Sequence, residues 1–229
     1  MNETVATVFL VDDDESFLTG LARLFRASGL LVKSFSSAAD FLAQLPPEAA
    51  GCVVADLQMP GMSGIELQEA LAKSKNPLPI VFLTGQGDIP TSVIAMRHGA
   101  EDFLTKRAPK EELIAAVNRA LERDARDRKV RIRRRELSAR FETLTPRERE
   151  VLAHVLRGQL NKQIAAALGI DERSMKRHRT SLMRKLQVQS VAEPAQLAAE
   201  ADIGGRWPSI VPRYVPKGTV VNATCVRLN

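Results

Sequence analysis

The first half of the chain alternates short apolar runs with longer amphipathic stretches, and this alternation constrains the fold more than any other feature. The apolar runs cover residues 5–11, 30–34, 51–55, 80–83 and 102–105. Runs of this length predict buried strands. Between them, apolar residues recur at helical spacing, as in Phe17, Leu21 and Phe25. Five strands that alternate with helices predict an α/β doubly wound, five-stranded parallel sheet.

Polar side chains follow four of these predicted strands. Asp12 and Asp13 follow the first strand and Asp56 the third, while Thr84 and Lys106 follow the last two. In an open α/β sheet, the carboxyl ends of the strands form the binding crevice. Clustered carboxylates repel one another unless a cation binds, and a hard divalent ion, here Mg²⁺, fits oxygen ligands. Such a site suits phosphoryl transfer with one carboxylate as nucleophile.

The motifs at these strand ends resemble those of the receiver domain of two-component response regulators. They read Val11-Asp12-Asp13-Asp14, Asp56-Leu57-Gln58-Met59-Pro60-Gly61-Met62-Ser63-Gly64, Thr84-Gly85 and Phe103-Leu104-Thr105-Lys106. The resemblance implies the following roles: Asp56 as phosphoacceptor; Asp12, Asp13, Asp56 and the Gln58 backbone carbonyl as Mg²⁺ ligands; Thr84 and Lys106 as phosphate-sensing groups; and Phe103 as the switch aromatic. A receiver domain is therefore expected over residues 1–121.

One position departs from the family pattern. Arg107 follows Lys106 where the family usually has a proline, whose peptide bond is typically cis and shapes the loop that holds the lysine. We therefore expect that Lys106 could sit differently in this chain.

Charge divides the chain into two parts. The net charge of +6 combines net −5 over residues 1–121 with net +11 over residues 122–229, which predicts two different tasks. Residues 122–141 hold 9 Lys/Arg against 4 acids and few large apolar side chains. We interpret this stretch as a basic linker, and the sequence leaves open whether it is a solvated helix or a flexible connector. With aromatic residues at only 4%, stacked platforms for single-stranded nucleic acid are disfavoured.

Residues 142–202 carry the capping signals of a helical domain. Thr145, Pro146 and Glu148 provide an N-cap, a proline at the first helical position and a capping-box glutamate. A second helix is predicted over residues 161–168, and Asp171 is expected to cap a third. Ser190 is expected to cap a fourth helix that ends near residue 201. Short helices joined by a turn with glycine predict an all-α four-helix helix-turn-helix domain.

The third of these helices has an apolar and a basic face. Met175, His178, Leu182 and Leu186 share the face expected to point inward. The outer stripe holds Arg173, Lys176, Arg177, Thr180 and Arg184, and it suits the major groove of double-stranded DNA. His178 is expected to be packed or phosphate-adjacent rather than a zinc ligand, because no Cys/His spacing supports zinc.

Three motifs closely resemble the LuxR/FixJ-type DNA-binding domain. They are Thr145-Pro146-Arg147-Glu148-Arg149-Glu150-Val151-Leu152, Asn161-Lys162-Gln163-Ile164-Ala165 and Met175-Lys176-Arg177-His178-Arg179. The resemblance implies that Lys176, Arg177 and Thr180 lie nearest the bases, with Arg179 and Arg184 nearer the phosphates.

Together the two resemblances imply a transcriptional response regulator of the FixJ/NarL type that is not an enzyme in the usual sense. Its expected partners are a sensor histidine kinase, promoter DNA and a second copy of the chain in a homodimer formed on phosphorylation, with RNA polymerase as a candidate. The dimer face is expected around residues 91–98 and 110–121. Two alternatives remain: a phosphate sink or protein-interaction module that does not read sequence, and a metal-dependent phosphatase, which would need a pocket motif that we do not find.

The sequence holds no apolar run near the roughly 20 residues that span a bilayer, and no membrane partner is expected. We therefore expect a cytoplasmic protein. Cys52 and Cys225 are expected to be reduced thiols. The tail, residues 203–229, follows no periodic template, so packing against a domain and disorder both remain open.

Overall fold

The computed structural model describes residues 5–85, 93, 95–190 and 193–201. The chain divides into two compact units, Met1–Lys129 and Val130–Asn229. The tail with Cys225, and part of the expected dimer face at residues 91, 92 and 94, lie outside the described residues.

A five-stranded parallel sheet forms the centre of the first unit. Its strands are β1 Thr7–Val11, β2 Leu31–Phe35, β3 Gly51–Asp56, β4 Ile80–Thr84 and β5 Asp102–Thr105. They are arranged in the order β2-β1-β3-β4-β5. The predicted doubly wound sheet is confirmed. The strand boundaries differ from the predicted ones by at most two residues: β1 begins at Thr7, β2 lies one residue later than expected, and β3 and β4 each end one residue later.

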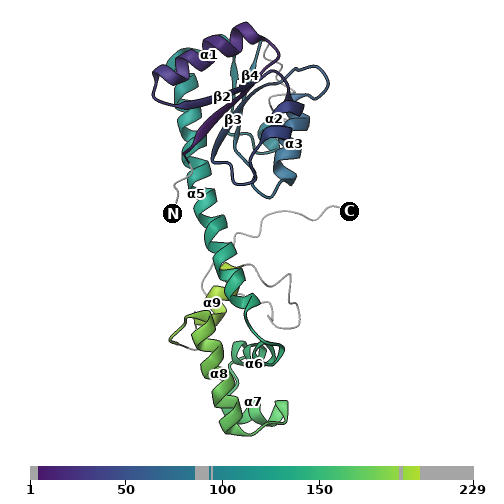
Figure 1. Cartoon of the computed structure of the whole chain (residues 1–229), viewed down its shortest axis with the longest axis vertical. Coiled ribbons are helices and arrows are strands. Elements are labelled where there is room, and N and C mark those ends of the chain that lie inside the picture. Colours follow the sequence, from purple (N-terminus) through teal and green to yellow (C-terminus); the bar gives the residue numbers. More distant parts are fainter. Residues whose placement is uncertain (1–4, 86–92, 94, 191–192, 202–229) are drawn as a thin grey trace. The chain divides into compact units, whose positions relative to one another are not determined.

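Helices cover both faces of this sheet (Figure 1). α1 Glu15–Ala27 and α5 Lys110–Glu142 pack on one face, through a cluster that includes Leu18, Phe25 and Val117. α2 Ala38–Gln44 and α3 Gly64–Lys73 pack on the other, through Phe41 and Leu67. β3 and β4 are buried along their whole length, as expected for central strands that are covered on both sides.

Helix α5 continues without interruption through the basic stretch to Glu142. The choice between helix and flexible connector is therefore resolved in favour of a helix. Within the first unit, Asp124 of α5 is 1% exposed, and its Oδ2 accepts the backbone N–H of Gly51 at 2.9 Å. Gly51 has φ +136°, and a Cβ there would lie 1.8 Å from the Thr7 carbonyl oxygen. The part of α5 that follows residue 121, the predicted end of the receiver domain, therefore still contacts the start of β3.

The second unit holds α6 Pro146–Leu156, α7 Asn161–Leu168, α8 Glu172–Leu186 and α9 Glu193–Glu200. The predicted caps are confirmed for three of these helices. Thr145 and Glu148 form the capping box of α6, Gly169 ends α7 at φ +63°, and the Asp171 side chain accepts the Ser174 N–H at the start of α8. Buried side chains of α6, α7 and α8 pack together, among them Val151, Ile164 and Met175.

One contact supports the expected cap at Ser190. The described part of α9 begins at Glu193, after residues 191 and 192, which lie outside the described residues, and the backbone N–H of Ser190 donates to the Glu193 carboxylate at 3.1 Å, as in one half of a capping box. Elsewhere, Cys52 is a fully buried free thiol, and burial raises its pKa. Within the part of the chain that the structure describes, no helix is both long enough and apolar enough to cross a membrane.

Candidate functional site

Three carboxylates gather at the carboxyl ends of β1 and β3. One oxygen from each of Asp12, Asp13 and Asp56 lies within 4.8 Å of the other two. Asp12 and Asp56 are only 3% and 9% exposed, whereas Asp13 is exposed. Three oxygen ligands that face one small region, partly open to water, fit a hard divalent cation such as Mg²⁺. The convergence expected from the strand order is therefore present.

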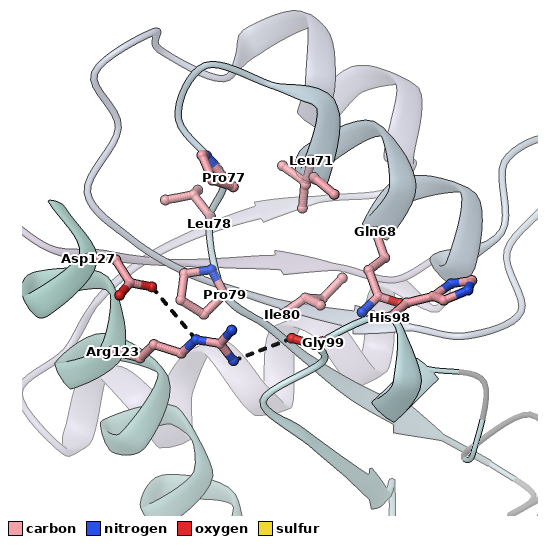
Figure 2. A pocket seen from close by; sticks show the side chains of 11 residues that line it. Gln68, Leu71, Pro77, Leu78, Pro79, Ile80, His98, Gly99, Arg123 and Asp127 are labelled. Atoms are coloured by element: carbon pink, nitrogen blue, oxygen red, sulfur yellow. Dashed lines mark hydrogen bonds and ion pairs between the residues drawn. The ribbon is translucent and has the colours of Figure 1, made fainter. Parts of the chain in front are cut away.

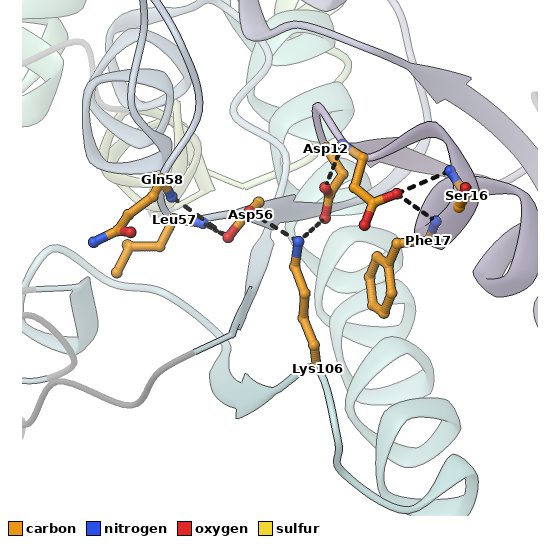
Figure 3. A network of polar contacts seen from close by, with 8 residues as sticks. Asp12, Ser16, Phe17, Asp56, Leu57, Gln58 and Lys106 are labelled. Carbon is orange, nitrogen blue, oxygen red and sulfur yellow. Dashed lines mark hydrogen bonds and ion pairs between the residues drawn. The ribbon is translucent and has the colours of Figure 1, made fainter.

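Lys106 lies between the two buried carboxylates (Figure 3). Its Nζ is 2.7 Å from Asp12 Oδ2 and 2.9 Å from Asp56 Oδ2. The lysine is held at the end of β5, because its backbone N–H donates to the Thr84 carbonyl at 2.8 Å. With Arg107 in the next position, Lys106 still reaches both carboxylates. An ammonium in this position would meet the oxygens of any group bound to Asp56.

Burial and pairing shift the protonation of this cluster. Burial raises the pKa of Asp12 above its ordinary value, although hydrogen bonds from Lys106 and the Asp14 N–H act against the shift. Burial alone would lower the pKa of Lys106, but the contacts with Asp12 and Asp56 reverse that effect and raise it. Lys106 is therefore held as a cation at neutral pH.

The backbone around Asp56 orients the carboxylate. Its Oδ1 accepts the N–H of Leu57 at 2.6 Å and, more weakly, that of Gln58 at 3.4 Å, which directs Oδ2 to Lys106. Gly64 begins α3 directly beneath this turn, and a Cβ there would lie 2.5 Å from the Asp56 carbonyl oxygen. The Gln58 side chain is exposed, so the predicted role of Gln58 rests on its backbone carbonyl alone.

The two remaining receiver positions lie on β4 and β5. Thr84 ends β4, is 3% exposed and pairs in register with Thr105. Phe103 is half-buried and packs against Phe82, with ring centroids 6.4 Å apart. Their roles as phosphate-sensing hydroxyl and switch aromatic stay predictions.

Sequence reasoning missed one neighbour of this cluster. The ring of Phe17, on α1, lies with its centroid 4.7 Å from Lys106 Nζ (Figure 3). Its apolar spacing indicated only a core residue, and no one-dimensional signal pairs it with a lysine 89 positions later. A cation over an aromatic face is stabilised electrostatically.

The basic stripe of α8 is exposed as predicted. Arg173, Lys176, Arg177, Thr180 and Arg184 are all exposed, while Met175, Leu182 and Leu186 are fully buried. His178, expected on the inner face, is half-buried. Arg179 is also partly buried, and its guanidinium donates to Asn161 Oδ1 at the start of α7. Exposed side chains on one helical face leave cations available for a polyanion.

An open groove runs along this face of the second unit. It has a volume of about 460 Å³ and is lined by Asn161, Lys176, Arg179, Thr180, Met183, Val188 and Gln189. Three of the predicted DNA contacts, Lys176, Arg179 and Thr180, therefore border one groove.

The first unit holds a separate hollow (Figure 2). It measures about 170 Å³, and its walls include Leu71, Pro77 and Pro79. Arg123 lies at its edge, where it donates to the Gly99 carbonyl at 3.3 Å and pairs with Asp127 at 3.7 Å. Since Ile80, the first residue of β4, also lines it, this hollow lies at the opposite end of the sheet from Asp56.

Comparisons with known proteins show the family of each of the two domains. The family described as response regulator receiver domain matches residues 8–118, and bacterial regulatory proteins of the luxR family match residues 142–198. The chain is 42% identical to response regulator protein TodT of Pseudomonas putida over 193 residues, covering 84% of this chain and 85% of TodT. It is 43% identical to nodulation protein W of Bradyrhizobium diazoefficiens over 190 residues, covering 83% and 84%.

Two solved structures resemble the whole architecture. Response regulator StyR is 46% identical, with a TM-score of 0.77 over 86% of this chain and 99% of StyR. Full-length FixJ from B. japonicum is 36% identical, with a TM-score of 0.53 over 87% of this chain and 98% of FixJ.

Proposed function

The chain belongs to the FixJ/NarL-type response regulators of two-component systems, DNA-binding transcriptional regulators, and on this premise we propose that phosphorylation of Asp56 by a sensor histidine kinase controls its DNA binding. The observation that carries the proposal is Lys106 bridging the buried Asp12 and Asp56 beside a third carboxylate. We further propose that the protein acts in the cytoplasm, where promoter DNA is found.

The proposed transfer moves one phosphoryl group onto Asp56. A carboxylate oxygen of Asp56 forms a bond to phosphorus, the bond from phosphorus to the kinase imidazole nitrogen breaks, and the imidazole takes up a proton. Asp12, Asp13, Asp56 and the Gln58 carbonyl would hold Mg²⁺, which when bound supplies positive charge to the phosphoryl oxygens. Lys106 would offset the same charge, and the Thr84 hydroxyl would donate a hydrogen bond to a phosphoryl oxygen. Because the acceptor is the chain's own residue, the receiver acts on itself and not on a pool of substrate.

The exposed face of α8 is the proposed DNA-reading surface. Lys176, Arg177 and Thr180 would face the bases of the major groove, Arg179 and Arg184 would lie nearer the phosphates, and the exposed Arg173 would be a further DNA contact. Phosphorylation would favour a homodimer, whose two copies of α8 would contact half-sites roughly 34 Å apart.

The test of this proposal is footprinting of the full chain with and without a small phosphodonor, acetyl phosphate, in Mg²⁺. The wild-type chain should protect a defined site at lower concentration once phosphorylated. Asp56→Asn should remove that response completely, whereas Asp127→Asn, at an exposed carboxylate on α5, should preserve it. A phosphorylated wild-type chain that protects no defined site would favour the phosphate-sink or protein-interaction alternative.

Dimerisation is tested by sedimentation of the same proteins. The wild-type chain should shift toward the dimer on addition of acetyl phosphate and Mg²⁺, and Asp56→Asn should remain unshifted. A tenfold change in the active population needs about 1.4 kcal/mol of differential interaction. An unchanged wild-type profile would contradict the dimer.

Two substitutions on α8 distinguish side chains that recognise bases from side chains that bind the DNA phosphate backbone. Lys176→Ala should relax base preference, while Arg184→Ala should weaken binding to all duplexes alike and reduce the salt slope by about 1. Equal losses on specific and random duplexes for both variants would contradict this division.

A further inference from the structure

Helix α7 has little apolar surface with which to fix its place beside α8. It spans eight residues, of which Ile164 and Ala165 are buried. These side chains pack against Met175 of α8 and Val155 of α6, and the partly buried Leu168, at the end of α7, packs against the same cluster. The apolar contacts therefore hold the middle and the end of α7, and its start at Asn161 depends on polar groups.

Two arginines contact α7 at its two ends. At its start, Arg179 of α8 donates through Nη1 to Asn161 Oδ1. At its end, Arg147 of α6 donates through Nη2 to the carbonyl oxygen of Leu168 at 2.6 Å. Both arginines are partly buried. Hydrogen bonds with a charged donor are among the stronger ones in proteins, and burial strengthens them further.

Arg179 differs in this respect from its neighbour on the same helix. Arg177 is exposed, and its guanidinium bonds to Ser174 within α8. The Arg179 guanidinium instead joins α8 to a different helix. It also lies among the side chains proposed to read bases, since Arg179 and Asn161 border the same groove as Lys176 and Thr180.

We infer that Arg179 is a positioning residue, which together with Asn161 fixes the start of α7 against the DNA-reading helix, and not a phosphate contact. This inference rests on the proposed DNA-binding function. It reassigns one of the two expected phosphate contacts: the charge of Arg179 is used within the protein, whereas the exposed Arg173 and Arg184 remain available to the phosphate backbone. Asn161, which carries no charge, becomes as important for DNA affinity as the arginine it accepts from.

The test is a double-mutant cycle in the full chain with Asn161→Ala, Arg179→Ala and both together. The probes are the best duplex selected from a random library by the wild-type chain and an unrelated duplex of equal length. Each single variant should lose about 10-fold in affinity for the selected duplex, and the double variant no more than either single one. Arg179→Ala should keep the wild-type salt slope, whereas the control Arg184→Ala should reduce it by about 1. Asn161→Asp, which retains an acceptor for Arg179, should bind nearly as the wild type does.

Two outcomes would overturn the inference. A lowered salt slope in Arg179→Ala together with unchanged affinity in Asn161→Ala would make Arg179 a phosphate contact. Additive losses in the double variant would show that the two residues act separately.

Thermal unfolding of the same variants separates this inference from the function on which it rests. Without DNA, the double variant should show the same fall in Tm as each single variant. Additive falls in Tm would contradict the inference that Asn161 and Arg179 together fix the start of α7. If the wild-type chain selects no duplex at all, the proposed DNA reading fails, and the cycle in Tm still decides whether Asn161 and Arg179 act as one unit.

Discussion

The two charged sites of this chain are built in opposite ways. The acidic site joins residues that are far apart in sequence, and its buried Asp12 and Asp56 are paired with the partly buried Lys106. The basic site lies on the single helix α8, and most of its cations are exposed. Members of a buried, paired site should depend strongly on one another, while exposed cations in water should contribute small and nearly independent amounts.

The largest expected effect is the loss of the cation between the two buried carboxylates. Lys106→Met leaves Asp12 and Asp56 without a positive partner, so it should lower the free energy of unfolding of the first unit by about 3 to 5 kcal/mol in EDTA at neutral pH. Added Mg²⁺ should recover part of this loss, because a divalent ion can replace the ammonium. Denaturant unfolding of the full chain measures both values.

The control for this experiment is Lys110→Met, because Lys110 is exposed and pairs with its exposed neighbour Glu111 at 3.7 Å. It should change stability by less than about 0.5 kcal/mol. Equal effects of the two substitutions would break the contrast between buried and exposed charge.

The second prediction concerns a buried ion pair inside the basic half. Burial would raise the pKa of Glu148, but the Lys185 ammonium at 2.6 Å and donors from Thr145 and Ser181 outweigh it and lower the pKa to about 2. A carboxyl with a depressed pKa in the folded state stabilises the fold above its ordinary value of 4.5, and that stability is lost as pH falls from about 4.5 toward 2. The loss should approach about 3 kcal/mol.

Glu148→Gln should remove this acid dependence from the unfolding of the second unit, as followed by helical circular dichroism between pH 5 and pH 2. The exposed Glu172→Gln, in the first turn of α8, should retain it. An acid profile that Glu148→Gln leaves unchanged would show that the pair is not coupled to folding.

The smallest expected effect is that of the aromatic neighbour of Lys106. Phe17→Leu keeps an apolar side chain but removes the ring face, which is worth about 1 kcal/mol to a partly buried cation. The rate of Asp56 phosphorylation by acetyl phosphate should therefore fall about 3- to 5-fold. Phe17→Tyr should restore the rate, and mass spectrometry of the intact chain measures it. No difference between Leu and Tyr at this position would limit Phe17 to a packing role.

The acidic site could be predicted from sequence because topology alone determines it. Once the strands are parallel and adjacent, Asp12, Asp56 and Lys106 must arrive at the same edge. The helix caps were equally accessible, since an N-cap depends only on side chains within one turn. Both predictions rest on backbone geometry and not on where a long side chain turns.

The contacts that the sequence did not predict depend on the direction in which a side chain points in the folded protein. The family resemblance placed Arg179 near the DNA phosphates, yet its guanidinium is long enough to reach Asn161 on the neighbouring helix. Likewise, Phe17 fitted a core pattern, and only the folded loop brings Lys106 over its ring. Asp124 looked like one more solvated charge in a polar helix, because nothing in the sequence signals that a single carboxylate is buried.

The contact between Asp124 and Gly51 determines where this polypeptide can be cut. A receiver fragment ending at residue 121 would omit Asp124 and leave the buried N–H of Gly51 without its carboxylate, at a cost of about 1 to 3 kcal/mol. A fragment that ends at Lys129 keeps that contact, so its free energy of unfolding should be higher than that of the fragment ending at residue 121. In amide hydrogen exchange, the N–H of Gly51 would report directly whether the helix remains attached to its sheet.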